Sequence, residues 1–226
     1  MNLLSASIVF WLSFVGILHT YVIFPLVISL WAKIRGSHAG LTETMEVDPS
    51  SLPSITVLIA AYNEERTIRE RVKNLADCSY PKDKMTVMIG SDGSTDATNA
   101  LLEELSTQYP WLHVVCFTEN RGKAEVLNAL FPSVSTPISV FTDADTVFSL
   151  NALEELVEPF REANVGCVAG LRLVRNSALE TVTEQQEKSY LNLDNKIRRA
   201  EGALGCVIGA HGSLFALRTE LIRPLP

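Results

Sequence analysis

Two kinds of apolar pattern alternate along most of this chain. Short, nearly unbroken runs of β-favouring residues predict buried strands, and apolar residues that recur every three to four positions predict amphipathic helices. The predicted strands are residues 55–60, 85–90, 114–117, 138–141 and 165–173. Strands that alternate with helices predict an α/β fold, a mainly parallel sheet with helices on both faces.

Each predicted helix is defined by the residues that it turns toward the sheet. The inward positions in chain order are Ile68, Val72 and Leu75; Ala97, Leu101 and Leu105; Leu127, Leu130 and Phe131; and Leu153, Leu156, Val157 and Phe160. Thr95 and Asn151 precede two of these helices and are expected to cap them. A charged helix is predicted over 178–200. The glycine-punctuated segment 205–218 fits a β-turn-β element or a loop whose backbone approaches a ligand.

The N-terminal segment has a different pattern. From Leu3 to Trp31 the apolar run is interrupted only by four serines, His19 and Thr20. About 20 apolar residues cross a bilayer, so the run predicts a membrane helix, with Pro25 as a possible kink. A cleaved signal peptide fits less well, because the run is too long and no Lys or Arg precedes it.

Charge and composition set the topology and the domain plan. Lys33 and Arg35 follow the apolar run, which predicts that the rest of the chain is cytoplasmic and attached to the cell membrane by this single span. The expected organisation is a transmembrane helix at 1–35, a polar linker at 36–52 and a globular domain at 53–226. A net charge of −7 argues against a nucleic-acid partner.

The cysteines carry no metal or disulfide signature. Cys78, Cys116, Cys167 and Cys206 are widely spaced, and three of them lie in apolar, strand-like runs. We therefore expect buried free thiols.

The strongest chemical signal is Asp143-Ala144-Asp145, which ends the predicted strand at 138–141. Side chains two apart on an extended segment point the same way, so the two carboxylates repel each other unless a cation lies between them. Carboxylate oxygens suit Mg²⁺ or Mn²⁺, which usually arrive with substrate phosphates. The competing interpretation of these residues alone is an acidic turn before a helix.

Other strand ends carry complementary groups. Ligands of parallel sheets bind beyond the carboxyl ends of the strands, where Tyr62, Asp92 and Asp143 all fall. Tyr62 offers a flat face to a base, and Asp92 can accept from a base N–H. Glu64 can accept from sugar hydroxyls, and Lys123 can meet phosphate. Singly, each also fits a structural role: Glu64 in a helix cap, Asp92 in a turn and Lys123 in solvent.

Four motifs in register resemble the membrane-bound family 2 glycosyltransferases, which include processive polysaccharide synthases. They are Ala-Tyr-Asn-Glu-Glu at 61–65, Ser-Asp-Gly-Ser-Thr-Asp at 91–96, Arg-Gly-Lys at 121–123 and Thr-Asp-Ala-Asp-Thr at 142–146. The resemblance covers about 53–218. It implies a GT-A fold and an inverting, Mg²⁺- or Mn²⁺-dependent transfer from a nucleoside diphosphate sugar, usually a UDP-sugar, to a glycan or lipid-linked acceptor.

The resemblance also assigns roles to residues. Tyr62 and Asp92 would hold the uracil, Lys123 would face the diphosphate, Asp143 would bind ribose or diphosphate, and Asp145 would ligate the metal. The segment 209–213 would border the acceptor, which His211 could contact. The residues expected to bind substrate are Ala61, Tyr62, Glu64, Asp92, Lys123, Asp143, His211 and Gly212; those expected to act in catalysis are Lys123, Asp143 and Asp145, with Asp143 and Asp145 at the metal.

Two departures limit this assignment. The family often has two Asp where this chain has Ser91-Asp92, and the Asp that usually serves as the acceptor base lies beyond Pro226. We therefore expect a C-terminally truncated chain that binds donor and turns over poorly. A nucleotide-sugar-binding module without catalysis is the main alternative, and a nucleotidyltransferase is a weaker one because no Gly-rich, basic loop follows the first strand.

Overall fold

The computed structural model describes residues 3–35, 51–171, 182–205, 209 and 213–225. These residues belong to two compact units. One unit contains residues 1–43 and 171–209, and the other contains residues 44–170 and 210–226.

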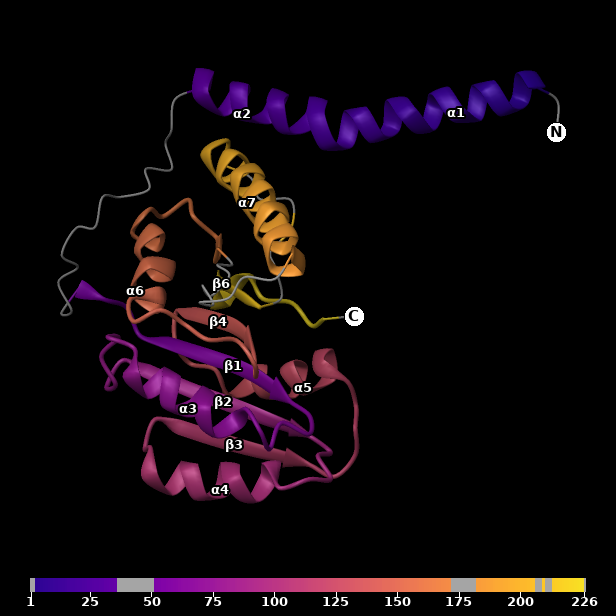
Figure 1. Cartoon of the computed structure of the whole chain (residues 1–226). Coiled ribbons are helices and arrows are strands. Elements are labelled where there is room, and N and C mark those ends of the chain that lie inside the picture. Colours follow the sequence, from indigo (N-terminus) through magenta and orange to yellow (C-terminus); the bar gives the residue numbers. More distant parts are fainter. Residues whose placement is uncertain (1–2, 36–50, 172–181, 206–208, 210–212, 226) are drawn as a thin grey trace. The chain divides into compact units, whose positions relative to one another are not determined.

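The larger unit is built on one six-stranded sheet (Figure 1). Its strands are β1 (Ile55–Ala61), β2 (Met85–Asp92), β3 (Leu112–Phe117), β4 (Ile138–Asp143), β5 (Cys167–Ala169) and β6 (Leu214–Arg218). The order is β3-β2-β1-β4-β6-β5. Strands β1 to β4 are parallel, whereas β6 pairs antiparallel with β4 and β5. The prediction of a mainly parallel α/β sheet is therefore confirmed.

Helices cover both faces of this sheet. They are α3 (Ile68–Asp77), α4 (Thr98–Gln108), α5 (Lys123–Leu130) and α6 (Ala152–Val157), with short 3₁₀ turns at Phe131–Ser133, Glu158–Arg161 and Thr219–Leu221. Alternate residues of β1 separate the two cores, because Val57 packs with α3, α4 and α6 whereas Leu58 packs with α5. The inward faces predicted for α3 and α6 are buried.

The start of α4 differs from the prediction. The helix begins at Thr98, and Asp96 accepts hydrogen bonds from both the backbone N–H and the hydroxyl of Thr98. Thr95 therefore does not cap it. The buried face also differs from the prediction: Ala97, at the N-cap position, is exposed, and Leu102, which was not predicted, is buried with Leu105.

Other local predictions are only partly right. Asn151 occupies the N-cap position of α6, but its side chain makes no capping bond and instead accepts from Ser79. Strand β5 is shorter than the predicted 165–173, of which residues 172 and 173 lie outside the described part. In the segment 205–218 the structure shows a single strand, β6, among the residues that it describes.

The cysteine prediction is wrong for two thiols. Cys78 is buried, but Cys116 and Cys167 are exposed. Both exposed residues lie on β3 and β5, the two outermost strands of the sheet, where a run of apolar residues is not covered on every side. Cys206 lies outside the described residues.

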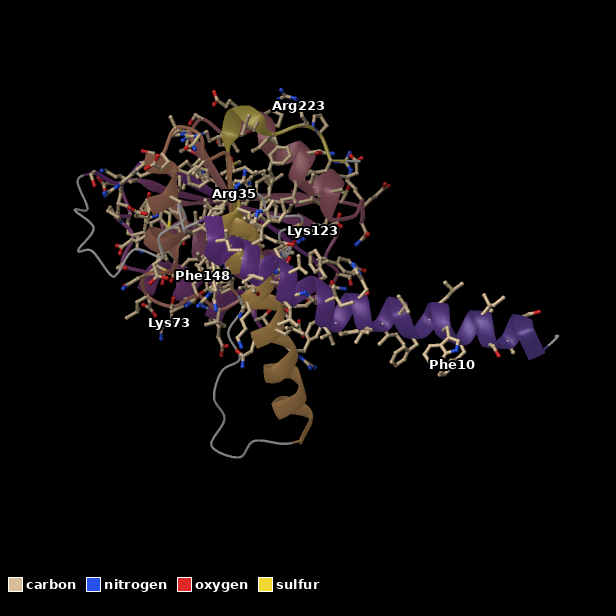
Figure 2. All side chains as sticks on the ribbon, turned by 90° about the horizontal axis from the view of Figure 1, so that it is seen from above. Phe10, Arg35, Lys73, Lys123, Phe148 and Arg223 are labelled. Atoms are coloured by element: carbon tan, nitrogen blue, oxygen red, sulfur yellow. The ribbon has the colours of Figure 1, made fainter. Side chains whose placement is uncertain are left out.

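The smaller unit contains the N-terminal helices and α7 (Val182–Ala203). Helix α1 (Leu3–Leu18) continues through a π-helical turn, His19–Ile23, into α2 (Phe24–Arg35), against which α7 packs. The π turn precedes Pro25, which has no N–H to donate to the preceding turn. Apolar side chains such as Phe10 project into the surroundings (Figure 2). Within the described residues, only the helix Ser5–Arg35 is long and apolar enough to cross a membrane.

Candidate donor-binding site

The register of the sheet brings the predicted strand-end residues to one edge. Asp143 of β4 pairs with Ala60 of β1, and Ala61 pairs with Ser91 of β2. Tyr62 and Asp92 are each the next residue along. Ala61 is buried, whereas the side chain of Tyr62 is half exposed. The parallel strands thus present Tyr62, Asp92 and Asp143 at their common carboxyl edge, as the topology predicts.

The loops after β1 and β2 are joined by hydrogen bonds. The Asn63 side-chain oxygen accepts from the N–H of Thr95 (2.8 Å), and the Asn63 N–H donates to the hydroxyl of Ser94 (3.1 Å). Asn63 has φ +55°, a left-handed conformation that Asn tolerates better than most residues. These contacts orient the segment from which Tyr62 projects.

Glu64 also joins these loops, through its backbone. Its N–H donates to the Thr98 hydroxyl at 2.8 Å, and its carboxylate accepts from the hydroxyl of Thr67. Thr67 is the N-cap residue of α3, without a side-chain capping bond. Neither Asn63 nor Glu64 therefore caps α3 through its side chain, which was the structural alternative for these residues.

Asp92 anchors a third loop to this edge. Its carboxylate accepts the backbone N–H groups of Arg121 (2.7 Å) and Gly122 (2.9 Å), and the side chain is almost fully buried. The neighbouring Gly93 has φ +67°, and a Cβ there would lie 2.5 Å from the backbone of Glu119 and Asn120. Asp92 thus holds the Arg121–Lys123 motif beside β2, a role that the sequence did not indicate.

Lys123 and Asp143 meet directly. The Lys123 ammonium forms an ion pair with the Asp143 carboxylate, and both side chains are more than one third exposed to solvent. An apolar pocket of about 380 Å³ adjoins this pair and is lined by Leu58, Ala124, Leu127, Phe141, Thr142, Phe215 and Leu225, together with Lys123. A phosphate and a cation could replace the internal pairing, because each carries the charge that one partner needs.

Asp145 is the group most available to a ligand. It is exposed, and within the described part of the chain its carboxylate has neither a hydrogen bond nor an ion pair. The described residues contain no cluster of three His, Cys, Asp or Glu side chains suited to a metal. Two carboxylates completed by substrate phosphates still fit Mg²⁺ or Mn²⁺, which commonly bind in this way.

Sequence reasoning missed Arg71 and Asn74 of α3. Arg71 is buried and donates to Thr142, the residue before Asp143, at 3.0 Å. Asn74 bonds both the N–H and the C=O of Phe148, at 2.8 and 3.0 Å. Burial lowers the pKa of Arg71 to about 10, against the raising influence of Cys78, Asp145 and Asp143. The signal available was a charge on the inward face of α3, between Ile68 and Val72.

The predicted acceptor side is described only at its end. His211 and Gly212 lie outside the described residues. Ser213 follows them, and its carbonyl accepts from the hydroxyls of Thr142 (2.8 Å) and Thr146 (3.4 Å). The end of segment 209–213 therefore lies directly beside the Asp143–Asp145 turn.

Comparison with known proteins identifies the family. Residues 56–224 match the model of glycosyl transferase family 2. The chain belongs to that family. Its fold matches that of a solved structure, the mannosyltransferase PcManGT from Pyrobaculum calidifontis in complex with GDP-Man and Mn²⁺. That structure matches with a TM-score of 0.70 at 28% identity, over 92% of this chain and 55% of the other.

Two relatives of this family 2 glycosyltransferase are named for different products. The chain is 32% identical to a beta-monoglucosyldiacylglycerol synthase of Nostoc sp. over 76% of its length, and 30% identical to a poly-beta-1,6-N-acetyl-D-glucosamine synthase of Staphylococcus aureus (strain COL) over 74%. The matched regions span 37% and 40% of those relatives. One makes a glycolipid and the other a polysaccharide, so the acceptor class differs between them.

Proposed function

We propose that the chain carries the donor-binding domain of an inverting glycosyltransferase that transfers a sugar from a nucleoside diphosphate sugar to a glycan or lipid-linked acceptor. The observation that carries the proposal is the convergence of Tyr62, Asp92, Lys123, Asp143 and Asp145 at the carboxyl edge of the parallel strands. Family membership and the relatives' products support the same reaction class.

The donor binds across this edge in our account. Tyr62 stacks on the base. The Asp92 carboxylate accepts hydrogen bonds from the N–H groups of the base, through lone pairs that the backbone N–H groups of Arg121 and Gly122 do not occupy. Glu64 lies near the ribose. Lys123 turns from Asp143 to the diphosphate, and its charge then offsets the charge that develops on the leaving group.

Asp143 and Asp145 hold the divalent ion in this proposal, and Asp143 becomes available when Lys123 moves. A bound Mg²⁺ or Mn²⁺ supplies further charge stabilisation to the leaving diphosphate. Mn²⁺ in the complex of the Pyrobaculum mannosyltransferase supports a divalent ion here. Segment 209–213, with His211 and Gly212, borders the acceptor.

The base of the donor is uracil in our proposal, because the motifs resemble enzymes that use UDP-sugars. The Pyrobaculum mannosyltransferase was solved with GDP-Man, so guanine is the alternative that a specific observation supports. We further propose that residues 5–35 span the cell membrane, and that the globular domain at 53–226 lies on the cytoplasmic side behind a linker at 36–52.

A donor screen tests the proposed function. UDP-glucose, UDP-N-acetylglucosamine and GDP-mannose are titrated with Mn²⁺ into the whole chain in detergent. We expect at least one UDP-sugar to bind and Asp145→Asn to lose the binding, whereas Asp83→Asn, an exposed Asp outside the site, keeps it. Binding of GDP-mannose alone would change the donor assignment, and binding of none would contradict the function. Nucleotide release with added lipid then distinguishes a transferase from a binding module.

A further inference from the structure

Arg71 is an unusual residue for the position that it occupies. It lies on the inward face of α3 with 3% of its surface exposed, among the apolar residues that pack this helix on the sheet. Burying a guanidinium is costly unless its donors are satisfied. Its Nε has no hydrogen-bond partner among the described residues.

Arg71 contacts residues that flank the Asp143–Asp145 turn. One terminal nitrogen donates to the Thr142 hydroxyl (3.0 Å), immediately before Asp143, and the other donates to the Asn74 side-chain oxygen (3.1 Å). The guanidinium also lies 4.0 Å from the centre of the Phe148 ring. Arg71 therefore contacts residues on both sides of the segment 143–147.

Asn74 fixes the other end of this segment through hydrogen bonds to Phe148. Its amide oxygen accepts the N–H of Phe148 (2.8 Å), and its amide nitrogen donates to the carbonyl of Phe148 (3.0 Å). Two side chains about one turn apart on α3 thus hold both ends of the segment that carries Asp143 and Asp145. Within the segment Ala144 is buried and the Thr146 hydroxyl donates to the Ser213 carbonyl, whereas Asp145 and Val147 are exposed.

The two groups that accept hydrogen bonds from Arg71 also have other hydrogen-bond partners. Without it, the Thr142 hydroxyl still donates to the Ser213 carbonyl and the Asn74 oxygen still accepts from Phe148. Removing the guanidinium therefore leaves neither group without a partner, and it relieves the cost of a buried charge. A role in holding the turn accounts for this residue better than a role in stability.

We propose that Arg71 and Asn74 are positioning residues that hold the Asp143–Asp145 turn in the geometry needed for metal-dependent donor binding. This inference rests on the proposed donor site. Groups that orient metal-binding carboxylates commonly change metal affinity by roughly 10- to 100-fold when they are removed. The same contacts reach Ser213 through Thr142, so they also join the donor side to the start of β6.

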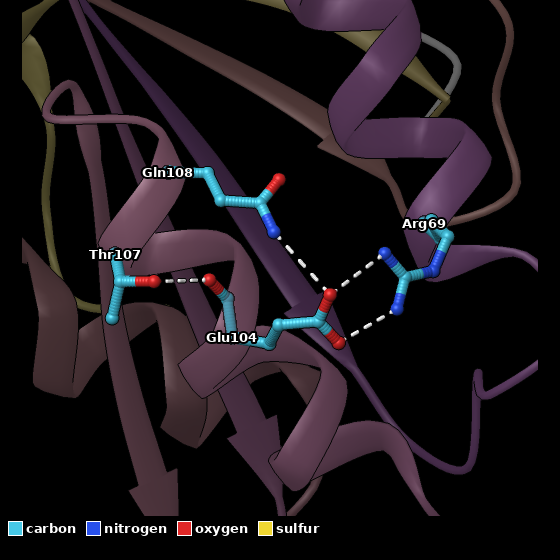
Figure 3. A network of polar contacts seen from close by, with 4 residues as sticks. All are labelled: Arg69, Glu104, Thr107 and Gln108. Carbon is cyan, nitrogen blue, oxygen red and sulfur yellow. Dashed lines mark hydrogen bonds and ion pairs between the residues drawn. The ribbon is translucent and has the colours of Figure 1, made fainter.

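The test uses variants that separate hydrogen bonding from charge. Arg71→Lys keeps a positive charge but cannot hold Thr142 and Asn74 together, and Asn74→Ala releases Phe148 without any change of charge. The matched control is Arg69→Lys on the same helix. Arg69 is exposed and pairs with Glu104 of α4, away from the turn (Figure 3).

The measurement is the affinity of the whole chain for UDP with and without Mn²⁺, together with the melting temperature of each variant. We expect Arg71→Lys and Asn74→Ala to weaken binding in Mn²⁺ by about tenfold or more and to leave metal-free binding near that of the wild type. Asn74→Ala also lowers the melting temperature, because the N–H and C=O of Phe148 lose their partner, so binding is measured well below the melting temperature of each variant. Arg69→Lys should match the wild type throughout.

The possible failures are distinguishable. Wild-type affinity in both variants would overturn this inference and leave the donor site intact. An equal loss with and without Mn²⁺, or failure of both variants to fold, would assign the two residues a general structural role and also overturn it. Absence of Mn²⁺-dependent binding in the wild type would instead contradict the donor site itself, and the inference with it.

Discussion

Asp92 shows how one side chain at the strand edge can serve both the fold and a ligand. Its carboxylate accepts two backbone N–H groups from the loop that carries Lys123, and only 4% of its surface is exposed. A carboxylate has about four lone-pair positions, so capacity remains for a base N–H. The residue type is required for the loop before any donor binds.

Replacing Asp92 by Asn should therefore lower stability as well as donor affinity. One of the two loop N–H groups loses its acceptor, because an amide presents a single oxygen, and a hydrogen bond to a charged group contributes about 1.5–3 kcal/mol. Urea denaturation measures the change, with the exposed Asp83→Asn as control. A loss of donor affinity at unchanged stability would show that the loop does not depend on this carboxylate.

At the scale of the elements, the position of a strand in the sheet decides what its apolar residues do. Strands β1, β2 and β4 are buried at nearly every residue, whereas β3 and β5, at the two ends of the strand order, are partly exposed. Strand composition is similar in β2 and β3. The exposure of Cys116 and Cys167 therefore follows from strand order, which the sequence pattern does not contain.

Thiol labelling tests this arrangement. We expect a maleimide to modify Cys116 and Cys167 in the folded chain and to spare Cys78, which becomes reactive only in denaturant. Burial and Glu103 raise the pKa of Cys116, and burial raises that of Cys167, so thiolate is scarce near neutral pH and labelling should accelerate as pH rises. Peptide mapping by mass spectrometry identifies the sites. Rapid labelling of native Cys78 would contradict the packing of α3.

At the scale of the whole molecule, the predictable features were those that depend on local pattern and general topology. The unbroken runs of β1 and β4 predicted buried parallel strands, and parallel strands bring Tyr62, Asp92 and Asp143 to one edge. The ion pair of Lys123 with Asp143 was not predictable, because it depends on how the loop before α5 lies across the edge.

Arg71 was missed for a related reason. A charged residue on an amphipathic helix is normally expected to reach solvent, and only the placement of α3 against β4 shows that its guanidinium ends beneath Thr142. The start of α4 was also misplaced, because Asp96, not Thr95, forms the bonds at the helix start.

The proposed membrane span makes a prediction for the whole chain. An 18-residue stretch of the helix Ser5–Arg35 has a mean hydropathy of 1.9, so we expect the chain to stay in the membrane fraction after alkaline carbonate extraction. Leu18→Arg combined with Val22→Arg should release it, because each Arg near the centre of a span costs about 2.5–3.5 kcal/mol. Extraction of the wild-type chain would contradict a membrane span.

The central claim is that this family 2 glycosyltransferase chain binds its donor through a divalent ion at Asp143 and Asp145. Calorimetric titration of UDP into the whole chain, with and without Mn²⁺, tests it most directly. We predict binding with Mn²⁺ that weakens by at least about tenfold, or about 1.4 kcal/mol, when the ion is removed or when Asp145 is changed to Ala. Equal affinity with and without Mn²⁺, or an unchanged Asp145→Ala variant, would contradict the claim.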